Sequence, residues 1–125
     1  MIFGTGVDVV EHSRISLVRG KSENRFIGRI LTAEEISEYH KVKLKDQYLA
    51  SRFASKEALG KALKTGLRNP VLFQNIIVVS STLNAPVFQF APALQTYLSD
   101  LSIRSVHLSI SHEKSLSCAM VIAER

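Results

Sequence analysis

Residues 46–63 read DQYLASRFASKEALGKAL, and this stretch determines the kind of fold that the rest of the chain can form. Alanine recurs in it at every fourth position, beside large apolar residues on the same side of a helix. The apolar stripe consists of Leu49, Ala50, Phe53, Ala54, Ala58, Ala62 and Leu63. This 3.6-residue period is typical of a helix with one buried face, so we predict a long helix here. Asp46 is expected to cap its start and Thr65-Gly66 to end it.

Residues 2–10 predict a strand, because they are rich in small and β-branched residues that alternate. Asp8 shares one face of this strand with the apolar Val10. Gly4 and Gly6 do not lead into a helix, so they indicate close backbone packing rather than a phosphate-binding loop.

The other segments predict shorter elements. Thr32 and Glu35 have the spacing of a capping box, which predicts a short helix to about His40. After Pro70 the pattern changes to short β-branched runs and one helix that begins at Pro92. We predict a hairpin of residues 75–80 and 87–90, a helix at 92–100, and strands at 105–111 and 116–123. This order favours an α+β fold, with a small antiparallel sheet packed against the long helix.

The composition is that of one globular domain. The chain has 125 residues, of which 46% are hydrophobic and 22% charged, so an intrinsically disordered chain is excluded and a single domain over residues 1–125 is predicted. Membrane-length apolar runs and a signal sequence are not visible, so a cytoplasmic protein with no membrane partner is expected. Cys118, the single cysteine, is expected to be a buried structural thiol. The formal charge of +5 predicts a surface that attracts anions.

Two acids occupy positions that are unfavourable for a charge. Asp8 lies in the apolar strand, and Glu57 lies four residues after Phe53, at the border of the apolar stripe. Glu57 and Lys61 form, on one interpretation, an ordinary i,i+4 ion pair worth about 0.2–0.5 kcal/mol. If the strand packs on the helix, Asp8 and Glu57 instead converge on a two-carboxylate site, which suits Mg²⁺ completed by water and substrate phosphate.

Positive charge is concentrated in two segments. The first surrounds the expected metal site, and phosphate is the ligand that it fits. It contains Lys41, Lys43, Lys45, Arg52, Lys56, Lys61, Lys64 and Arg68. The second is either a docking surface for an acidic partner or a solvated helical face. It contains Arg14, Arg19, Lys21, Arg25 and Arg29.

His112 is the histidine with a candidate functional role. Ser111 and His112 end a predicted strand, and a Ser-His nucleophile pair is one interpretation. Adjacent residues of an extended strand point to opposite faces, however, and no orienting acid is identifiable. Contact with an anion or a nucleotide is therefore favoured over nucleophilic catalysis. The histidines expected to be structural or exposed are His12, His40 and His107.

Three segments now form a pattern. They are GVDVVE at residues 6–11 followed by Arg14-Ile15, RFASKEA at residues 52–58 followed by Lys61-Ala62, and LSISH at residues 108–112. Together they resemble the motifs of the holo-[acyl-carrier-protein] synthases, the short 4′-phosphopantetheinyl transferases. The order and spacing also match, the second segment is the specific one, and the resemblance covers nearly the whole chain.

The resemblance implies transfer of the 4′-phosphopantetheine group of coenzyme A to a serine of apo acyl carrier protein, which leaves adenosine 3′,5′-bisphosphate. It implies Mg²⁺ as cofactor, with Asp8 and Glu57 as its ligands. Glu57 or a metal-bound water would take the serine proton, and Lys61 would hold the transferred phosphate. The residues implied to contact coenzyme A are Arg52, Lys61, Ser111 and His112, and those implied to receive the carrier protein are Arg14, Arg19 and Arg25.

The resemblance also implies a homotrimer with active sites at the subunit interfaces. Asn84-Ala85-Pro86 and Leu67-Arg68-Asn69-Pro70 depart from the family's usual turns near the expected nucleotide side of the pocket. Two other classes explain part of the sequence. A metal-dependent phosphohydrolase would use the same carboxylates and lysine to activate water, and a basic non-enzymatic protein-binding module would account for the positive charge. Nucleic acid is not expected as a partner, because tryptophan is absent and few aromatic residues are available to stack on bases.

Overall fold

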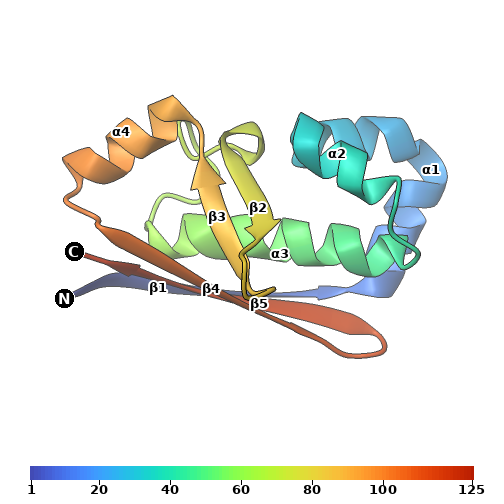
Figure 1. The fold of residues 1–125 in the computed structure, drawn as a ribbon. Coiled ribbons are helices and arrows are strands. Elements are labelled where there is room, and N and C mark those ends of the chain that lie inside the picture. Colours follow the sequence, from blue (N-terminus) through green and yellow to red (C-terminus); the bar gives the residue numbers. More distant parts are fainter.

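The computed structural model describes residues 1–125 as an α+β fold, which confirms the predicted class (Figure 1). The elements in chain order are β1 (Ile2–Glu11), α1 (His12–Ile30), α2 (Ala33–Tyr39), α3 (Lys45–Ala62), a 3₁₀ turn (Phe73–Asn75), β2 (Ile76–Ser80), β3 (Pro86–Phe90), α4 (Pro92–Asp100), β4 (Ser105–His112) and β5 (Leu116–Glu124). The predicted strands, the hairpin and three of the helices are confirmed. None of the helices has the length and apolar character needed to cross a membrane.

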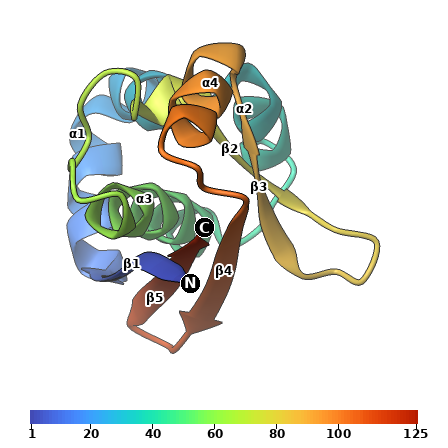
Figure 2. The ribbon, with the colours of Figure 1, turned by 90° about the vertical axis from the view of Figure 1, so that its left-hand side faces the viewer.

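The strands form two antiparallel sheets rather than one. β1, β5 and β4 pair in that order, and β2 pairs only with β3. Figure 1 shows α3 lying between the three-stranded sheet and a second layer made of α1, α2, α4 and the β2–β3 hairpin, and Figure 2 shows the same layers along the axis of α3. The β2–β3 hairpin and the β4–β5 hairpin therefore belong to separate sheets, and α4 joins them in the chain.

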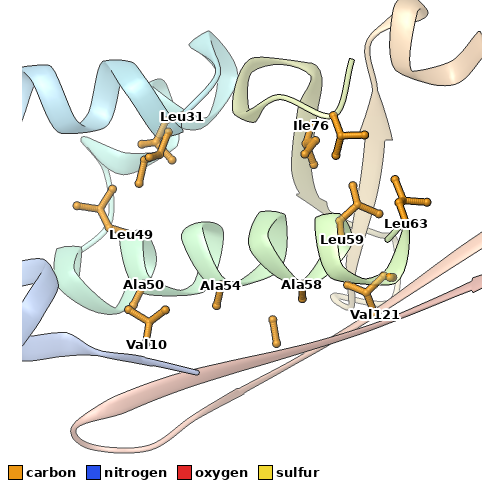
Figure 3. Packing of buried hydrophobic residues seen from close by; sticks show 14 of the residues in the cluster. Val10, Leu31, Leu49, Ala50, Ala54, Ala58, Leu59, Leu63, Ile76 and Val121 are labelled. Atoms are coloured by element: carbon orange, nitrogen blue, oxygen red, sulfur yellow. The ribbon is translucent and has the colours of Figure 1, made fainter. Parts of the chain in front are cut away.

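The core lies along both sides of α3 (Figure 3). On the sheet side, the helix presents Ala50, Ala54 and Ala58, which are fully buried and let the sheet approach closely. On the opposite side, Leu49 and Leu59 are also fully buried and pack towards the second layer. The long helix predicted from the alanine period is therefore confirmed, and both of its faces are covered.

Two glycines of β1 permit an unusually close contact with α3. A Cβ atom on Gly4 would lie 2.0 Å from the Ala62 carbonyl oxygen, and one on Gly6 would lie 1.9 Å from the Ala58 carbonyl oxygen. No side chain fits at either position, which confirms that these glycines serve close backbone packing. Asp8 follows on the same face of the strand, so the same packing brings its carboxylate to α3.

Two details of the helices differ from expectation. α3 begins at Lys45 with Leu44 as its N-cap, so Asp46 is not the cap; its carboxylate instead accepts a 2.7 Å hydrogen bond from Arg19 Nε. The basic run predicted as a docking surface or a solvated face lies on α1, a helix of 19 residues with a kink at Ser22. The capping box is confirmed, because Thr32 and Glu35 exchange side-chain and backbone hydrogen bonds at the start of α2.

Candidate active site

The predicted metal-binding residues come together where β1 crosses α3. Lys61 Nζ donates hydrogen bonds to the Val7 carbonyl oxygen at 2.8 Å and to Asp8 Oδ1 at 3.1 Å. Glu57 lies one helical turn before Lys61, on the same side of α3. Burial and the nearby Asp8 charge raise the pKa of Glu57, and Lys61 only partly opposes them. The structure therefore places two carboxylates and one ammonium group in a single cluster.

This cluster fits a hard divalent cation. Asp8 and Glu57 supply oxygen donors, and no group of three or more His, Cys, Asp or Glu residues capable of holding a metal is present. Two carboxylates are too few for a closed Ca²⁺ or Zn²⁺ site, whereas Mg²⁺ is commonly held by one or two carboxylates together with water and substrate phosphate. Burial raises the pKa of Glu57 most, and repulsion by Asp8 adds to it; a divalent cation between the carboxylates would relieve this repulsion.

A second cluster gathers around His112. His112 Nδ1 lies 2.9 Å from Ser117 Oγ, and His12 Nε2 lies 2.8 Å from the same oxygen. Burial lowers the pKa of His112, and the charges of His12 and Arg52 lower it further. Arg52 and His112 were predicted as ligand contacts from the sequence, whereas Ser117 was not, and His12 was expected to be structural or exposed. The contact between His12 and Ser117 joins the two ends of the chain, so no local sequence pattern could have predicted it.

Arg52 has unused hydrogen-bonding capacity. Its guanidinium lies 4.1 Å from the centre of the Tyr48 ring, and one terminal nitrogen donates to Ser51 Oγ at 3.0 Å. Its Nε is buried and has no hydrogen-bond partner. Tyr48 and Arg52 line a cleft of about 530 Å³ between α2, α3 and β2. Arg52 as a whole is only half-buried, so the terminal nitrogens of its guanidinium, rather than the buried Nε, are the donors that a ligand oxygen in this cleft could reach.

The two clusters lie on different sides of the protomer. Asp8 is on β1 and His112 on β4, which are the edge strands of a three-stranded sheet, so about two strand spacings, roughly 10 Å, separate the strands. Arg52 and Glu57 are five residues apart on α3, which turns them about 140° from each other. Ser111 points to the outer face of the sheet, away from His112. The predicted site residues therefore do not form one continuous site within a single chain.

The three arginines predicted to receive a partner differ in their availability. Arg14 and Arg25 are exposed on α1. Arg19 is half-buried, forms an ion pair with Asp46 at 2.7 Å and lies 3.8 Å from Glu23. Hydrogen bonding and the charge of Asp46 raise the pKa of Arg19. Arg14 and Arg25 are therefore the freer charges on this helix.

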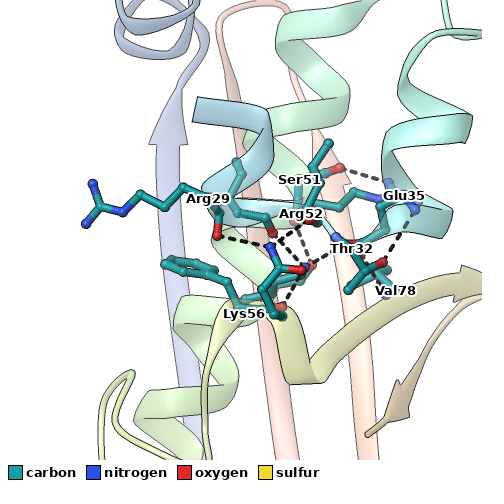
Figure 4. A network of polar contacts seen from close by, with 12 residues as sticks. Arg29, Thr32, Glu35, Ser51, Arg52, Lys56 and Val78 are labelled. Carbon is teal, nitrogen blue, oxygen red and sulfur yellow. Dashed lines mark hydrogen bonds and ion pairs between the residues drawn. The ribbon is translucent and has the colours of Figure 1, made fainter. Parts of the chain in front are cut away.

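One basic residue of the predicted phosphate-attracting segment is buried instead. Lys56 is 0% exposed, and its Nζ donates to Glu35 Oε1 at 2.6 Å, to the Ile30 carbonyl oxygen at 2.7 Å and to the Phe73 carbonyl oxygen at 3.1 Å (Figure 4). The expectation that Lys56 attracts phosphate is wrong, because a phosphate has no access to this nitrogen. Lys56 ties α3 to three other parts of the chain.

Comparison of the sequence and the structure with known proteins identifies the family of this chain. A family model described as the 4′-phosphopantetheinyl transferase superfamily matches residues 4–121. A holo-[acyl-carrier-protein] synthase of Nitrosospira multiformis is 48% identical over 125 residues, which are 100% of both chains. The crystal structure of the synthase from Neisseria meningitidis is 42% identical, covers 100% of both chains and has a TM-score of 0.97. The Bacillus anthracis synthase in complex with CoA (3′,5′-ADP) is 34% identical, with a TM-score of 0.82 over 99% of this chain and 97% of that one.

The chain therefore belongs to the 4′-phosphopantetheinyl transferase superfamily. The relatives that it matches over its full length, in sequence and in structure, are holo-[acyl-carrier-protein] synthases. The family, fold and enzyme class predicted from the three motifs are confirmed.

Proposed function

We propose that this enzyme transfers the 4′-phosphopantetheine group of coenzyme A to a serine of apo acyl carrier protein, and that the Asp8, Glu57 and Lys61 cluster is its catalytic centre. The observation that carries the assignment is the close crossing of β1 and α3, which aligns two carboxylates and an ammonium group on one face. Coenzyme A as substrate is supported by the CoA complex of the Bacillus anthracis relative.

In the proposed reaction, the serine oxygen of the carrier forms a bond to the β-phosphorus of coenzyme A. The bond from that phosphorus to the bridging pyrophosphate oxygen breaks, and adenosine 3′,5′-bisphosphate leaves. Glu57 accepts the serine proton, and its raised pKa makes it a better base than an ordinary glutamate. Lys61 is held by Val7 and Asp8 in a fixed position, so its charge is already in place when negative charge shifts on the phosphates.

Asp8 and Glu57 are the residues that would hold Mg²⁺. When bound, the ion would supply positive charge to offset the negative charge of the pyrophosphate. Arg52 and His112 would contact the nucleotide part of coenzyme A, and the half-buried guanidinium of Arg52 beside the cleft supports this role. Ser111 points away from His112, to the outer face of the sheet. It would contact the nucleotide only in a site formed together with a second subunit.

The carrier protein is proposed to dock on α1 through Arg14 and Arg25, with Arg19 contributing less because it is already paired. Exposed positive charge attracts an acidic partner and speeds its association. We also propose a cytoplasmic location. A single cysteine with no disulfide is consistent with a reducing compartment.

We propose a homotrimer with the active sites at its interfaces. The outer face of the three-stranded sheet exposes Val7 at 53%, Val9 at 56% and Met120 at 46%, and Cys118, expected to be buried, is only half-buried there. A contiguous apolar face of this kind is typical of a surface covered by a partner. Contact between copies would bring the His112 cluster of one subunit towards Asp8 of the next, which would complete the site.

The test is incubation of the protein with coenzyme A, Mg²⁺ and apo acyl carrier protein, with the carrier weighed by mass spectrometry. We expect the carrier to gain phosphopantetheine, chelation by EDTA to prevent this, and Asp8→Ala and Glu57→Ala each to lose transfer. Ser55→Ala removes a buried hydroxyl that bonds only to the Ser51 carbonyl oxygen within α3, and it serves as the control. Hydrolysis of coenzyme A without gain of mass would indicate a phosphohydrolase, and binding without chemistry would indicate an interaction module.

A further inference from the structure

The hydroxyl of Ser117 bridges two imidazole rings. Ser117 is 0% exposed, and its Oγ lies 2.8 Å from His12 Nε2 and 2.9 Å from His112 Nδ1. His12 is the first residue of α1, and His112 is the last residue of β4. The His12 N–H also donates to the Ser115 carbonyl oxygen at 2.8 Å, which fixes the start of α1 against the β4–β5 turn.

The single hydroxyl proton restricts how these rings can be protonated. A serine hydroxyl donates one hydrogen bond and accepts up to two, so it donates to only one of the two rings while the other ring donates to it. If both rings were imidazolium, both would donate and the hydroxyl proton would be left buried without an acceptor, which is unfavourable. The bridge therefore favours at most one positive charge on the pair.

A phosphate contact at His112 would favour one of these protonation states of the two rings. Nδ1 faces Ser117, so Nε2 is the ring atom that points away from the bridge. Phosphate oxygens only accept hydrogen bonds, so a useful contact requires a proton on Nε2. Without the bridge, the exposed ring is free to rotate and to present the wrong nitrogen.

We propose that Ser117 and His12 are positioning residues for the phosphate contact of His112: Ser117 fixes the ring through Nδ1, and the two imidazoles share one proton through its hydroxyl. The proposal rests on the proposed role of His112 in binding coenzyme A. It adds two residues from opposite ends of the chain, neither of which lies in the cluster around Glu57.

The charges around the pair determine the direction of its pH dependence. Burial lowers the pKa of His112, and the charges of His12 on α1 and Arg52 on α3, which both face His112, lower it further. The charged groups that line the surface around His12 are Glu11, Arg14, Arg19, Lys43, Lys45, Asp46 and Lys114. Because burial and the charges of His12 and Arg52 lower the pKa of His112, we expect this ring to take up a proton when an anionic phosphate binds.

The test compares KM for coenzyme A and kcat between about pH 6 and pH 8.5, a range that spans histidine titration. In Ser117→Ala, we expect KM to rise about five- to tenfold, as for loss of one buried hydrogen bond, with kcat within about twofold. Ser117→Thr keeps the hydroxyl and is expected to restore KM. His12→Gln keeps a group that can bond Ser117 but removes the charge that helps to lower the pKa of His112, so the rise of KM with pH should move to higher pH.

The controls are Ser55→Ala for a buried hydroxyl and His40→Gln for an exposed histidine, and both should match wild type. Ring nitrogen signals of His112 in NMR spectra give a readout independent of transfer: adenosine 3′,5′-bisphosphate should convert the ring to imidazolium in wild type and less completely in Ser117→Ala. The proposal is overturned if Ser117→Ala and His12→Gln keep the wild-type KM, pH profile and ring signals, or if these two variants lose only thermal stability. Failure of wild type to modify the carrier would instead reject the proposed function.

Discussion

Two lysines of α3, five residues apart, each pair with an acid from another element, yet their surroundings differ completely. Lys56 has an exposed side-chain fraction of 0% and uses three acceptors, Glu35 and two backbone carbonyl oxygens. Lys61 has an exposed fraction of 53% and uses two, Asp8 and the Val7 carbonyl oxygen. An ammonium group donates three hydrogen bonds, so Lys56 has none left and Lys61 keeps one for a ligand. Exposure and spare hydrogen-bonding capacity, rather than the presence of an ion pair, separate a structural lysine from a functional one.

The acids differ in the same way. Glu35 accepts from Lys56 and from the backbone N–H groups of Thr32 and Val78, so both of its oxygens are engaged. Glu57 has a raised pKa because it is partly buried near Asp8, with Lys61 as its only favourable charge. The first pair is satisfied by the protein alone. The second has carboxylates whose repulsion a bound cation would relieve.

The largest expected effect follows from breaking the buried pair. Lys56→Met leaves the Glu35 carboxylate buried without its cation, which typically costs about 3–5 kcal/mol of unfolding free energy. For a chain of this size, we expect the melting temperature to fall by more than about 10 °C, with kcat of the folded fraction preserved at low temperature. Thermal melts followed by circular dichroism check this, and a melting temperature equal to that of wild type would contradict it.

Lys61→Met should have the opposite profile. Losing a charge that is already in place at a reacting phosphate typically lowers kcat by about 10²–10³, or roughly 2.7–4 kcal/mol, whereas loss of an exposed ion pair costs about 0–1 kcal/mol of stability. The measurement is the rate of carrier modification at saturating substrates, beside a thermal melt. A clear fall in melting temperature with kcat preserved would make Lys61 a second structural lysine.

A charge that lies outside both pairs should affect only the encounter with the carrier protein. Reversal in Arg14→Glu should raise KM for the carrier about tenfold, and KM for coenzyme A much less, because exposed complementary charges contribute modestly and are screened by salt. Arg104→Glu, an equal charge reversal far from α1, is the matched control. If both reversals changed both KM values alike, α1 would not be the docking surface.

The smallest expected effect concerns the stability of the metal-free protein. A raised carboxyl pKa means that folded Glu57 binds its proton more tightly than the unfolded chain does, so stability falls as pH rises from the unfolded pKa, about 4.3, through the higher folded value. Glu57→Gln removes this loss. In EDTA, its melting temperature should match that of wild type below about pH 4 and exceed it slightly at neutral pH, because solvent screens much of the effect at a partly exposed group. A lower melting temperature at neutral pH would show that the Glu57 charge is stabilising.

The contrast between the buried Lys56 pair and the cluster around Glu57 also shows which features the sequence could predict. The helix of residues 46–63 and the strands followed from local periods, and close packing followed from Gly4 and Gly6. Asp8 and Glu57 were recognised because each is a charge beside apolar residues, an exception that a sequence displays directly. The cluster around them needed only one further assumption, that the first strand packs on the long helix.

The remaining features depend on contacts between distant parts of the chain. Lys56 lies among other cations in the sequence, and its acceptors are Glu35 and the carbonyl groups of Ile30 and Phe73, so nothing local marks it as buried. The bridge from His12 to Ser117 spans 105 residues. The division into two sheets depends on which face of α3 each hairpin covers. Such features arise from tertiary packing, which periodicity does not encode.

Calorimetric titration of Mg²⁺ into the protein saturated with coenzyme A tests most directly whether Asp8 and Glu57 form a metal site. Wild type should bind one ion per active site. Because even residues that only support metal ligands typically change affinity about 10–100-fold, loss of a ligand in Asp8→Asn should weaken Mg²⁺ binding by at least about tenfold. Lys56→Met, measured where it remains folded, should bind Mg²⁺ like wild type. Equal affinity and stoichiometry in wild type and Asp8→Asn would contradict the assignment of the catalytic centre.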